Sequence, residues 1–117
     1  AACGEVKPGE GMRAGESYGS CNGRFVLTLQ GDGNLVLRDK SQNGKALWAT
    51  GTSGSDGYAA TFQTDGNLVL YGHYQNALWS AHTNGKGGVR LAFQDDGNVV
   101  LYDAQSNAVW STGTANP

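Results

Sequence analysis

The sequence predicts an all-β chain built from one unit that occurs three times. Of its 117 residues 19 are glycine and only 15% are charged, a balance that suits short strands joined by tight turns. No window shows the 3.6-residue apolar period of a helix. One polar motif, Gln-x-Asp-Gly-Asn-x-Val, recurs, and a tryptophan follows each copy. The copies occupy residues 30–38, 63–71 and 94–102, and the tryptophans are Trp48, Trp79 and Trp110. Such a fixed period marks a repeat architecture.

The first 20 residues lie before the first repeat. They contain Pro8, five glycines and little apolar periodicity. We expect them to form an arm with one short strand near residues 11–14, which closes the assembly of sheets.

Each unit begins with a strand that leads directly into the motif. These strands are expected at residues 25–29, 58–62 and 89–93, and each ends at a glutamine. The Asp-Gly pair that follows is a strong hairpin signal, because a type I′ turn requires positive φ at both central residues. The motif therefore predicts a hairpin whose tight turn is flanked by glutamine and asparagine.

A third strand completes each unit. A polar turn follows each motif, and then comes Ala-Leu-Trp or Ala-Val-Trp. Gly- and Ser-rich links at residues 51–57 and 84–88 mark the unit boundaries. One domain, residues 1–117, thus holds three repeats at about 22–52, 56–83 and 88–113. Three such units can close into a β-trefoil or into a prism of three sheets around a pseudo-threefold axis.

The polar residues of the motif point to a binding surface. They recur at steps of two, which is the side-chain period of a strand, while residues such as Leu68 and Leu70 between them are apolar. Aspartate and asparagine alone are common turn formers. A turn, however, needs neither a glutamine two residues before the aspartate nor a tyrosine six residues after it. We therefore expect two amides, a carboxylate and a phenol to form one row beside a valine methyl surface.

The full motif, Gln-x-Asp-x-Asn-x-Val-x-Tyr, resembles the signature of the bulb-type, monocot mannose-binding (snowdrop-type) lectin family. The likeness covers roughly residues 9–115. It implies the β-prism II fold, with three antiparallel sheets of about four strands each, and the Gln-x-Trp of trefoil lectins is absent. It also implies calcium-independent binding of mannose and mannosylated glycans, with no cofactor and no enzymatic activity.

The resemblance assigns a role to each position of the motif. Asp65 and Asn67 would hold the axial 2-hydroxyl of mannose, Gln63 the 3-hydroxyl and Tyr71 the 4-hydroxyl, while Val69 packs on the ring carbons. The third unit repeats these roles with Gln94, Asp96, Asn98, Val100 and Tyr102. The first unit keeps Gln30, Asp32, Asn34 and Val36. It replaces the tyrosine with Arg38, a donor-only and mobile cation, so whether its site works is left open.

Other candidate chemistry has a simpler explanation. The three tryptophans could be sugar platforms, but one per unit can meet its copies at the axis, which favours the core. His73 and His82 lie in or near turns without a third ligand, which indicates surface residues rather than a metal site. Asp95 and Asp96 are neighbours that point to opposite faces, whereas glycoside hydrolysis needs two carboxylates at one site. The Asp-x-Asn spacing also lacks the further ligands of a calcium loop.

Charge and hydropathy exclude two classes of partner. The formal net charge is −2 with no basic cluster, so nucleic acid is disfavoured. No apolar run approaches the roughly 20 residues of a membrane span. The alternative to a lectin is an interaction or toxin-like protein that keeps the prism and has degenerate sugar sites.

Cysteine usage favours secretion. Cys3 and Cys21 are the only cysteines, and without zinc-ligand spacing they favour one disulfide that staples the arm, the alternative being a free buried pair. Ala1-Ala2 resembles a freshly cleaved end, so we expect an extracellular protein. In plant members of the resembled family a disulfide begins at the position of Gly33, which points to a microbial secreted member. Family members also exchange C-terminal strands, so residues 111–117 could support a homodimer.

Overall fold

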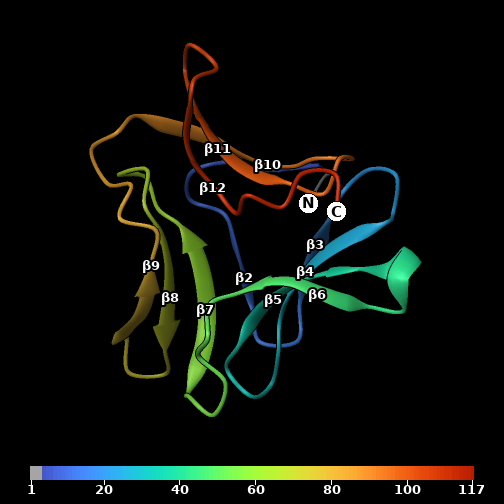
Figure 1. Cartoon of the computed structure of the whole chain (residues 1–117). Coiled ribbons are helices and arrows are strands. Elements are labelled where there is room, and N and C mark those ends of the chain that lie inside the picture. Colours follow the sequence, from blue (N-terminus) through green and yellow to red (C-terminus); the bar gives the residue numbers. More distant parts are fainter. Residues whose placement is uncertain (1–3) are drawn as a thin grey trace.

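The computed structural model describes residues 4–117 and consists of three antiparallel sheets of four strands each (Figure 1). The first sheet holds β3 (Ser17–Gly19), β4 (Phe25–Leu29), β5 (Leu35–Asp39) and β6 (Lys45–Ala49). The second holds β2 (Gly11–Arg13), β7 (Gly57–Phe62), β8 (Leu68–Gly72) and β9 (Ala77–Ser80). The third holds β1 (Glu5–Val6), β10 (Gly88–Phe93), β11 (Val99–Asp103) and β12 (Ala108–Ser111). The expected all-β fold of three four-stranded sheets is confirmed.

Helical structure in the described chain is one short 3₁₀ turn, Lys40–Gln42. Residues 4–117 contain no helix that is long and apolar enough to span a bilayer.

The N-terminal arm contributes three strands, not the single strand expected near residues 11–14. β1 pairs with β10, β2 with β7 and β3 with β4, so the arm supplies an outer strand to every sheet. Two tight turns divide it, at Lys7–Glu10 and Arg13–Glu16. In each turn the last residue's N–H donates to the first residue's carbonyl, and its carboxylate accepts the first residue's N–H. The repeated x-x-Gly-Glu pattern, with positive φ at Gly9 and Gly15, is the signal that the prediction did not use.

The core lies between the three sheets. Alternate residues of the strands point inward, as the period of two predicts, and the inner leucines are essentially inaccessible to solvent. Trp48, Trp79 and Trp110 meet edge to face, with ring centroids 5.4, 5.8 and 5.9 Å apart, and pack half-buried against this core. Such pairs contribute about 0.5 to 1.5 kcal/mol each beyond their buried area. The expectation that they meet their copies as part of the core is confirmed.

The hairpin turn at the motif differs from the predicted type I′ geometry. Each loop has three residues, because the glutamine N–H donates to the asparagine carbonyl at 2.8 to 2.9 Å. Positive φ occurs at Gly33, Gly66 and Gly97 and not at the aspartates. The aspartate carboxylate accepts the asparagine N–H two residues on, at 2.9 to 3.0 Å, which favours an Asx turn over positive φ. The type I′ prediction is therefore wrong, although the hairpin itself is correct.

Each turn glycine lies against the next unit in a cyclic order. A Cβ on Gly33 would lie 2.6 Å from the Ser55 carbonyl oxygen, and one on Gly66 would lie 3.2 Å from the Gly88 nitrogen. A Cβ on Gly97 would lie 2.8 Å from the Phe25 ring of unit one. Only glycine supplies both the positive φ and this close approach.

Candidate functional site

We call the motif residues 30–38, 63–71 and 94–102 sites one, two and three. In each site the glutamine ends the first strand of a hairpin, the aspartate lies in the turn, and the asparagine follows the turn. The valine and the last residue of the motif lie on the second strand of the hairpin. The fold therefore brings the predicted residues of each copy together on one hairpin, and the three copies lie on three different sheets.

Sites two and three share a hydrogen bond between glutamine and tyrosine. The Gln63 amide Nε2 donates to the Tyr71 hydroxyl, and the Gln94 amide donates to the Tyr102 hydroxyl. Each phenol accepts in this bond, so its own proton remains available to a ligand, as does the glutamine carbonyl oxygen as an acceptor. The pair thus presents one donor and one acceptor side by side.

The aspartates of sites two and three each keep one oxygen available. Asp65 Oδ1 accepts the Asn67 N–H at 2.9 Å, and Asp96 Oδ1 accepts the Asn98 N–H at the same distance. Within residues 4–117, no hydrogen bond reaches the second carboxylate oxygen of either residue. A charged acceptor with a lone pair free toward solvent forms a stronger bond to a hydroxyl than a neutral one does.

The asparagines fasten the turn to the chain that leaves the third strand. Their side-chain oxygens accept the backbone N–H groups of Thr52, Thr83 and Thr114 at 3.2, 3.0 and 3.3 Å. The same threonine hydroxyls donate to the turn glycine carbonyls at 2.7, 2.8 and 2.6 Å. These threonines were not predicted, although the spacing Trp-x-x-x-Thr recurs in all three units. The asparagine oxygen is therefore structural, and the NH₂ group is the part that can serve a ligand.

The asparagine NH₂ groups are not equally free. Asn67 Nδ2 donates to Ser80 Oγ at 3.0 Å, which leaves it one further N–H. The NH₂ groups of Asn34 and Asn98 make no hydrogen bond to the described part of the chain. Site three thus offers two donors from its asparagine, and site two offers one.

The valines lie deeper than the predicted methyl surface. Val69 and Val100 are each 4% exposed and Val36 is 2% exposed. Cross-strand neighbours flank them, Thr61 and Ser80 in the case of Val69. They form the floor of a shallow site and offer little area to a ligand.

Site one has the same backbone but different polar ends. Arg38 donates to the Gly44 carbonyl oxygen at 2.9 Å, and, with the Gln30 amide oriented to satisfy both groups, it donates to Gln30 at 2.9 Å. Arg38 is therefore held in place, and the expectation of a mobile cation is wrong. Asp32 Oδ2 accepts from Ser53 Oγ at 3.0 Å. The Arg38 guanidinium and the Asp32 carboxylate, the two groups that would contact a sugar, therefore already bond to other residues of the chain.

An ion pair between a buried aspartate and a partly exposed arginine lies beside site one. Asp39 is fully buried and accepts two hydrogen bonds from Arg24, at 3.0 and 2.8 Å, and others from Ser41 and Gln42. The Arg24 guanidinium, together with the hydroxyl and amide donors, holds the pKa of Asp39 well below its usual range despite burial. This network orders the turn after β5 and does not face the motif residues.

The alternative chemistries gain no support from the geometry. The Asp95 carboxylate accepts the Asn22 N–H at 3.0 Å, away from the turn bond that engages Asp96, so the two acids serve different neighbours. His73 and His82 are exposed. No group of three or more metal-ligating side chains occurs among residues 4–117.

Comparison with known sequences finds mannose-specific lectins among the relatives of this chain. No family model matches the chain. Over 69 residues, 58% of this chain, the sequence is 44% identical to the mannose-specific lectin of Narcissus pseudonarcissus, and the match covers 59% of that protein. The chain spans about half the length of the curated relatives it matches.

Solved structures match nearly the whole chain. A monomeric monocot mannose-binding lectin from Gastrodia elata has a TM-score of 0.83 at 39% identity, covering 96% of this chain and 98% of that one. The snowdrop (Galanthus nivalis) agglutinin bound to methyl-α-D-mannoside has a TM-score of 0.76 at 36% identity, with 97% and 99% covered. A domain-swapped lectin dimer from Mycobacterium smegmatis has a TM-score of 0.55 at 45% identity, with 91% and 95% covered.

These relatives come from flowering plants and a bacterium, and they do not support the expectation of a specifically microbial member. They share the three-sheet architecture that the repeated motif predicts. The chain therefore belongs to the bulb-type, monocot mannose-binding lectin family.

Proposed function

We propose that the chain is a lectin that binds mannose and mannose-containing glycans at sites two and three, without calcium. One observation carries this proposal. In both sites an aspartate with one free oxygen lies in the turn that leads to a glutamine–tyrosine pair with a free donor and a free acceptor. Vicinal hydroxyls donate and accept at once, so they match this mixed row.

The aspartate and asparagine would select mannose. The axial 2-hydroxyl would donate to the free oxygen of Asp65 or Asp96 and accept from the asparagine NH₂. The glutamine would bind the 3-hydroxyl, and the tyrosine would bind the 4-hydroxyl. An equatorial 2-hydroxyl points away from the turn and leaves the carboxylate without its bond, which costs about 1.5 to 3 kcal/mol.

The expected affinity for one mannose is weak. Four or five hydrogen bonds at a net ~1 kcal/mol each give at most on the order of 4 kcal/mol, the scale of a millimolar Kd, and the cost of association leaves no room for tighter binding. The nearly buried valine floor adds little contact area. Tight binding to branched glycans would come from two sites on one molecule, where effective concentration adds about 100-fold or more.

Titration with methyl α-mannoside and with its glucoside epimer, followed by NMR, tests the proposal. We expect millimolar binding of the mannoside, at least tenfold weaker binding of the glucoside, and no change when a chelator is added. A micromolar Kd for the monosaccharide would show a deeper site than this one. Folded protein that binds no glycan on an array would favour the alternative of an interaction or toxin-like protein.

We extend the proposal to an extracellular protein with a Cys3–Cys21 disulfide. Cys3 lies outside the described residues, but its neighbour Gly4 lies close to Cys21, since a Cβ at Gly4 would lie 3.0 Å from Cys21 Sγ. Peptide maps before and after reduction test the pairing. A map that does not change on reduction would exclude it.

A homodimer by exchange of C-terminal strands is a further proposal. The Mycobacterium smegmatis relative is described as domain-swapped, whereas the Gastrodia elata lectins are described as monomeric. In the structure β12 pairs with β11 of the same chain, and the Asn116 N–H donates to the Asp96 carbonyl oxygen at 2.6 Å. Exchange must break these contacts and remake them on the partner. Light scattering tests it, and a monomer at high concentration would exclude it.

A further inference from the structure

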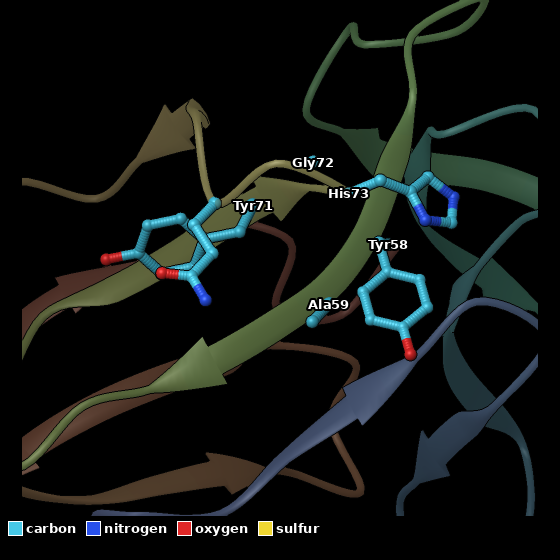
Figure 2. Close-up of a pocket in the computed structure, with 6 residues that line it drawn as sticks. Tyr58, Ala59, Tyr71, Gly72 and His73 are labelled. Carbon is cyan, nitrogen blue, oxygen red and sulfur yellow. The ribbon is translucent and has the colours of Figure 1, made fainter.

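A pocket lies beside site two and shares one residue with the mannose motif. It has a volume of about 470 Å³, within the usual range of small-ligand pockets. Figure 2 shows Tyr71 on one side of Ala59 and Tyr58 with His73 on the other. These four residues, together with Gly72 and Gln75, form the lining. Tyr71 is therefore shared between the motif and the pocket.

An irregularity of the sheet creates the aromatic wall. In the pairing of β7 with β8, Gly57 lies opposite Gly72 and Ala59 opposite Tyr71, so Tyr58 is an extra, bulged residue. Its side chain is 37% exposed and its ring lies 4.6 Å from the His73 ring. The Arg13 guanidinium lies 5.8 Å from the centroid of the same ring. The tyrosine is thus held between neighbours while part of it still faces solvent.

In unit three an arginine side chain, Arg90, occupies the space that corresponds to this pocket. There the bulged residue is Val89, and Arg90 lies opposite Tyr102 where unit two has Ala59 opposite Tyr71. The Arg90 guanidinium lies 4.2 Å from the centroid of the Tyr102 ring and reaches toward Ser106 Oγ at 3.5 Å. The small side chain of Ala59 leaves the side of Tyr71 open. The two sites share the motif but differ in what lies next to it.

We propose that this pocket is a second saccharide subsite, which binds the sugar residue linked to the mannose held in site two. The inference rests on the proposed mannose binding. The lining contains aromatic faces, which pack against the C–H face of a pyranose, and phenol, imidazole and amide groups, which bond hydroxyls. Among residues 4–117, no carboxylate or ammonium group belongs to the lining, so a neutral sugar fits better than a charged one. Because Tyr71 borders both spaces, the two ligands are adjacent residues of one glycan.

The test isolates site two by placing Asp32→Ala and Asp96→Ala in one background chain. Calorimetry then compares methyl α-mannoside with the α1,2-, α1,3- and α1,6-linked mannobiosides. We expect at least one mannobioside to bind about 2- to 10-fold tighter than the monosaccharide, the range that an added aromatic contact supplies. Ala59→Arg, which copies unit three, should abolish this advantage and leave methyl α-mannoside affinity unchanged.

A second variant guards against misfolding of the first. Tyr58→Val copies the bulged residue of unit three and should reduce the same advantage without filling the pocket. A mannobioside advantage that persists in both variants, or that is absent from the background chain, overturns the subsite while site two still binds mannose. Loss of methyl α-mannoside binding by the folded background chain would instead overturn the proposed function, and the subsite with it.

Discussion

Site one and sites two and three are built on the same hairpin but end in different side-chain contacts. All three keep the three-residue turn, the glycine with positive φ, the asparagine and the threonine that fastens the turn. In sites two and three, glutamine bonds a phenol and the aspartate keeps a free oxygen. In site one, Arg38 is bonded to Gly44, and Asp32 is bonded to Ser53.

The difference separates the residues that the fold requires from those that a ligand would require. The bonds repeated in every unit hold the turn against the exit of the third strand. The bonds that differ involve groups at the open side of the site. Repetition of the motif therefore predicts the scaffold three times but working sites only where the polar ends are free.

The largest expected effect comes from removing both free carboxylates. Asp65→Ala with Asp96→Ala should abolish measurable mannose binding, because loss of a charge-assisted bond at each site costs about 1.5 to 3 kcal/mol, over tenfold in Kd. Each single variant should remove one site, and Asp32→Ala is the matched control that should change stoichiometry little. Calorimetry measures all four. A double variant that binds at near-native strength would place the working sites elsewhere.

The next effect concerns the stability of unit one. Because the folded pKa of Asp39 lies below its unfolded value, its contribution to stability is present above the unfolded pKa of about 3.9 and is lost as pH falls through the folded pKa. Asp39→Asn should therefore lower Tm most near neutral pH, and the gap to the native chain should narrow below about pH 4. Melting curves from pH 7 to pH 3 measure the gap.

Asp103→Asn is the control in unit three. The pKa of Asp103 is also lowered, chiefly by the Asn107 N–H, but within residues 4–117 it forms no ion pair with an arginine. Asp103→Asn should therefore lower Tm, relative to the native chain, by less than Asp39→Asn does. If the Tm difference between Asp39→Asn and the native chain stays constant from pH 7 to pH 3, the stabilising role assigned to the ionised Asp39 carboxylate is wrong.

In site two, the threonine that fastens the turn links stability to mannose binding. Thr83 is 1% exposed, and its hydroxyl donates to the Gly66 carbonyl at 2.8 Å. Thr83→Val keeps the shape but leaves that acceptor unsatisfied, which costs about 1 to 3 kcal/mol of stability. Mannose affinity of site two should fall as well, because Asn67 loses part of its support. Thr52→Val should destabilise unit one without reducing mannose binding, and equal loss of binding in both variants would refute the comparison.

Much of the fold followed from spacing, whereas very short strands and side-chain contacts made in loops were not predicted. Alternation of leucine with polar residues identified the hairpins and the inner face. The arm was misjudged because strands of two or three residues show no period, although its two x-x-Gly-Glu turns were visible. The hydrogen bonds of Arg38 with Gly44 and of Asp32 with Ser53 depend on loop geometry that local sequence patterns do not encode.

A smaller effect should follow from restoring the missing phenol. Arg38→Tyr would let Gln30 make the bond seen in the other sites, a net contribution of about 1 kcal/mol or roughly fivefold in affinity. Calorimetry should then report three mannose sites instead of two. Arg38→Leu is the control, since it removes the guanidinium without supplying a hydroxyl. If both variants gain equally, the arginine was an obstacle and the phenol is not needed.

The smallest effect concerns Ser53, whose hydroxyl donates a hydrogen bond to Asp32. The corresponding positions in units two and three are Asn84 and Ala115, and no hydrogen bond links either to its aspartate in the described chain. Ser53→Ala thus copies unit three and frees one oxygen of Asp32. In the Arg38→Tyr chain it should tighten site one by roughly twofold, because the sugar hydroxyl no longer displaces a bond worth about 0.5 kcal/mol. Without Arg38→Tyr, Ser53→Ala should change mannose binding little, because Arg38 still bonds to Gln30. NMR titration of the double variant against Arg38→Tyr resolves this difference, and an unchanged site-one Kd would show that Ser53 yields to the ligand at no cost.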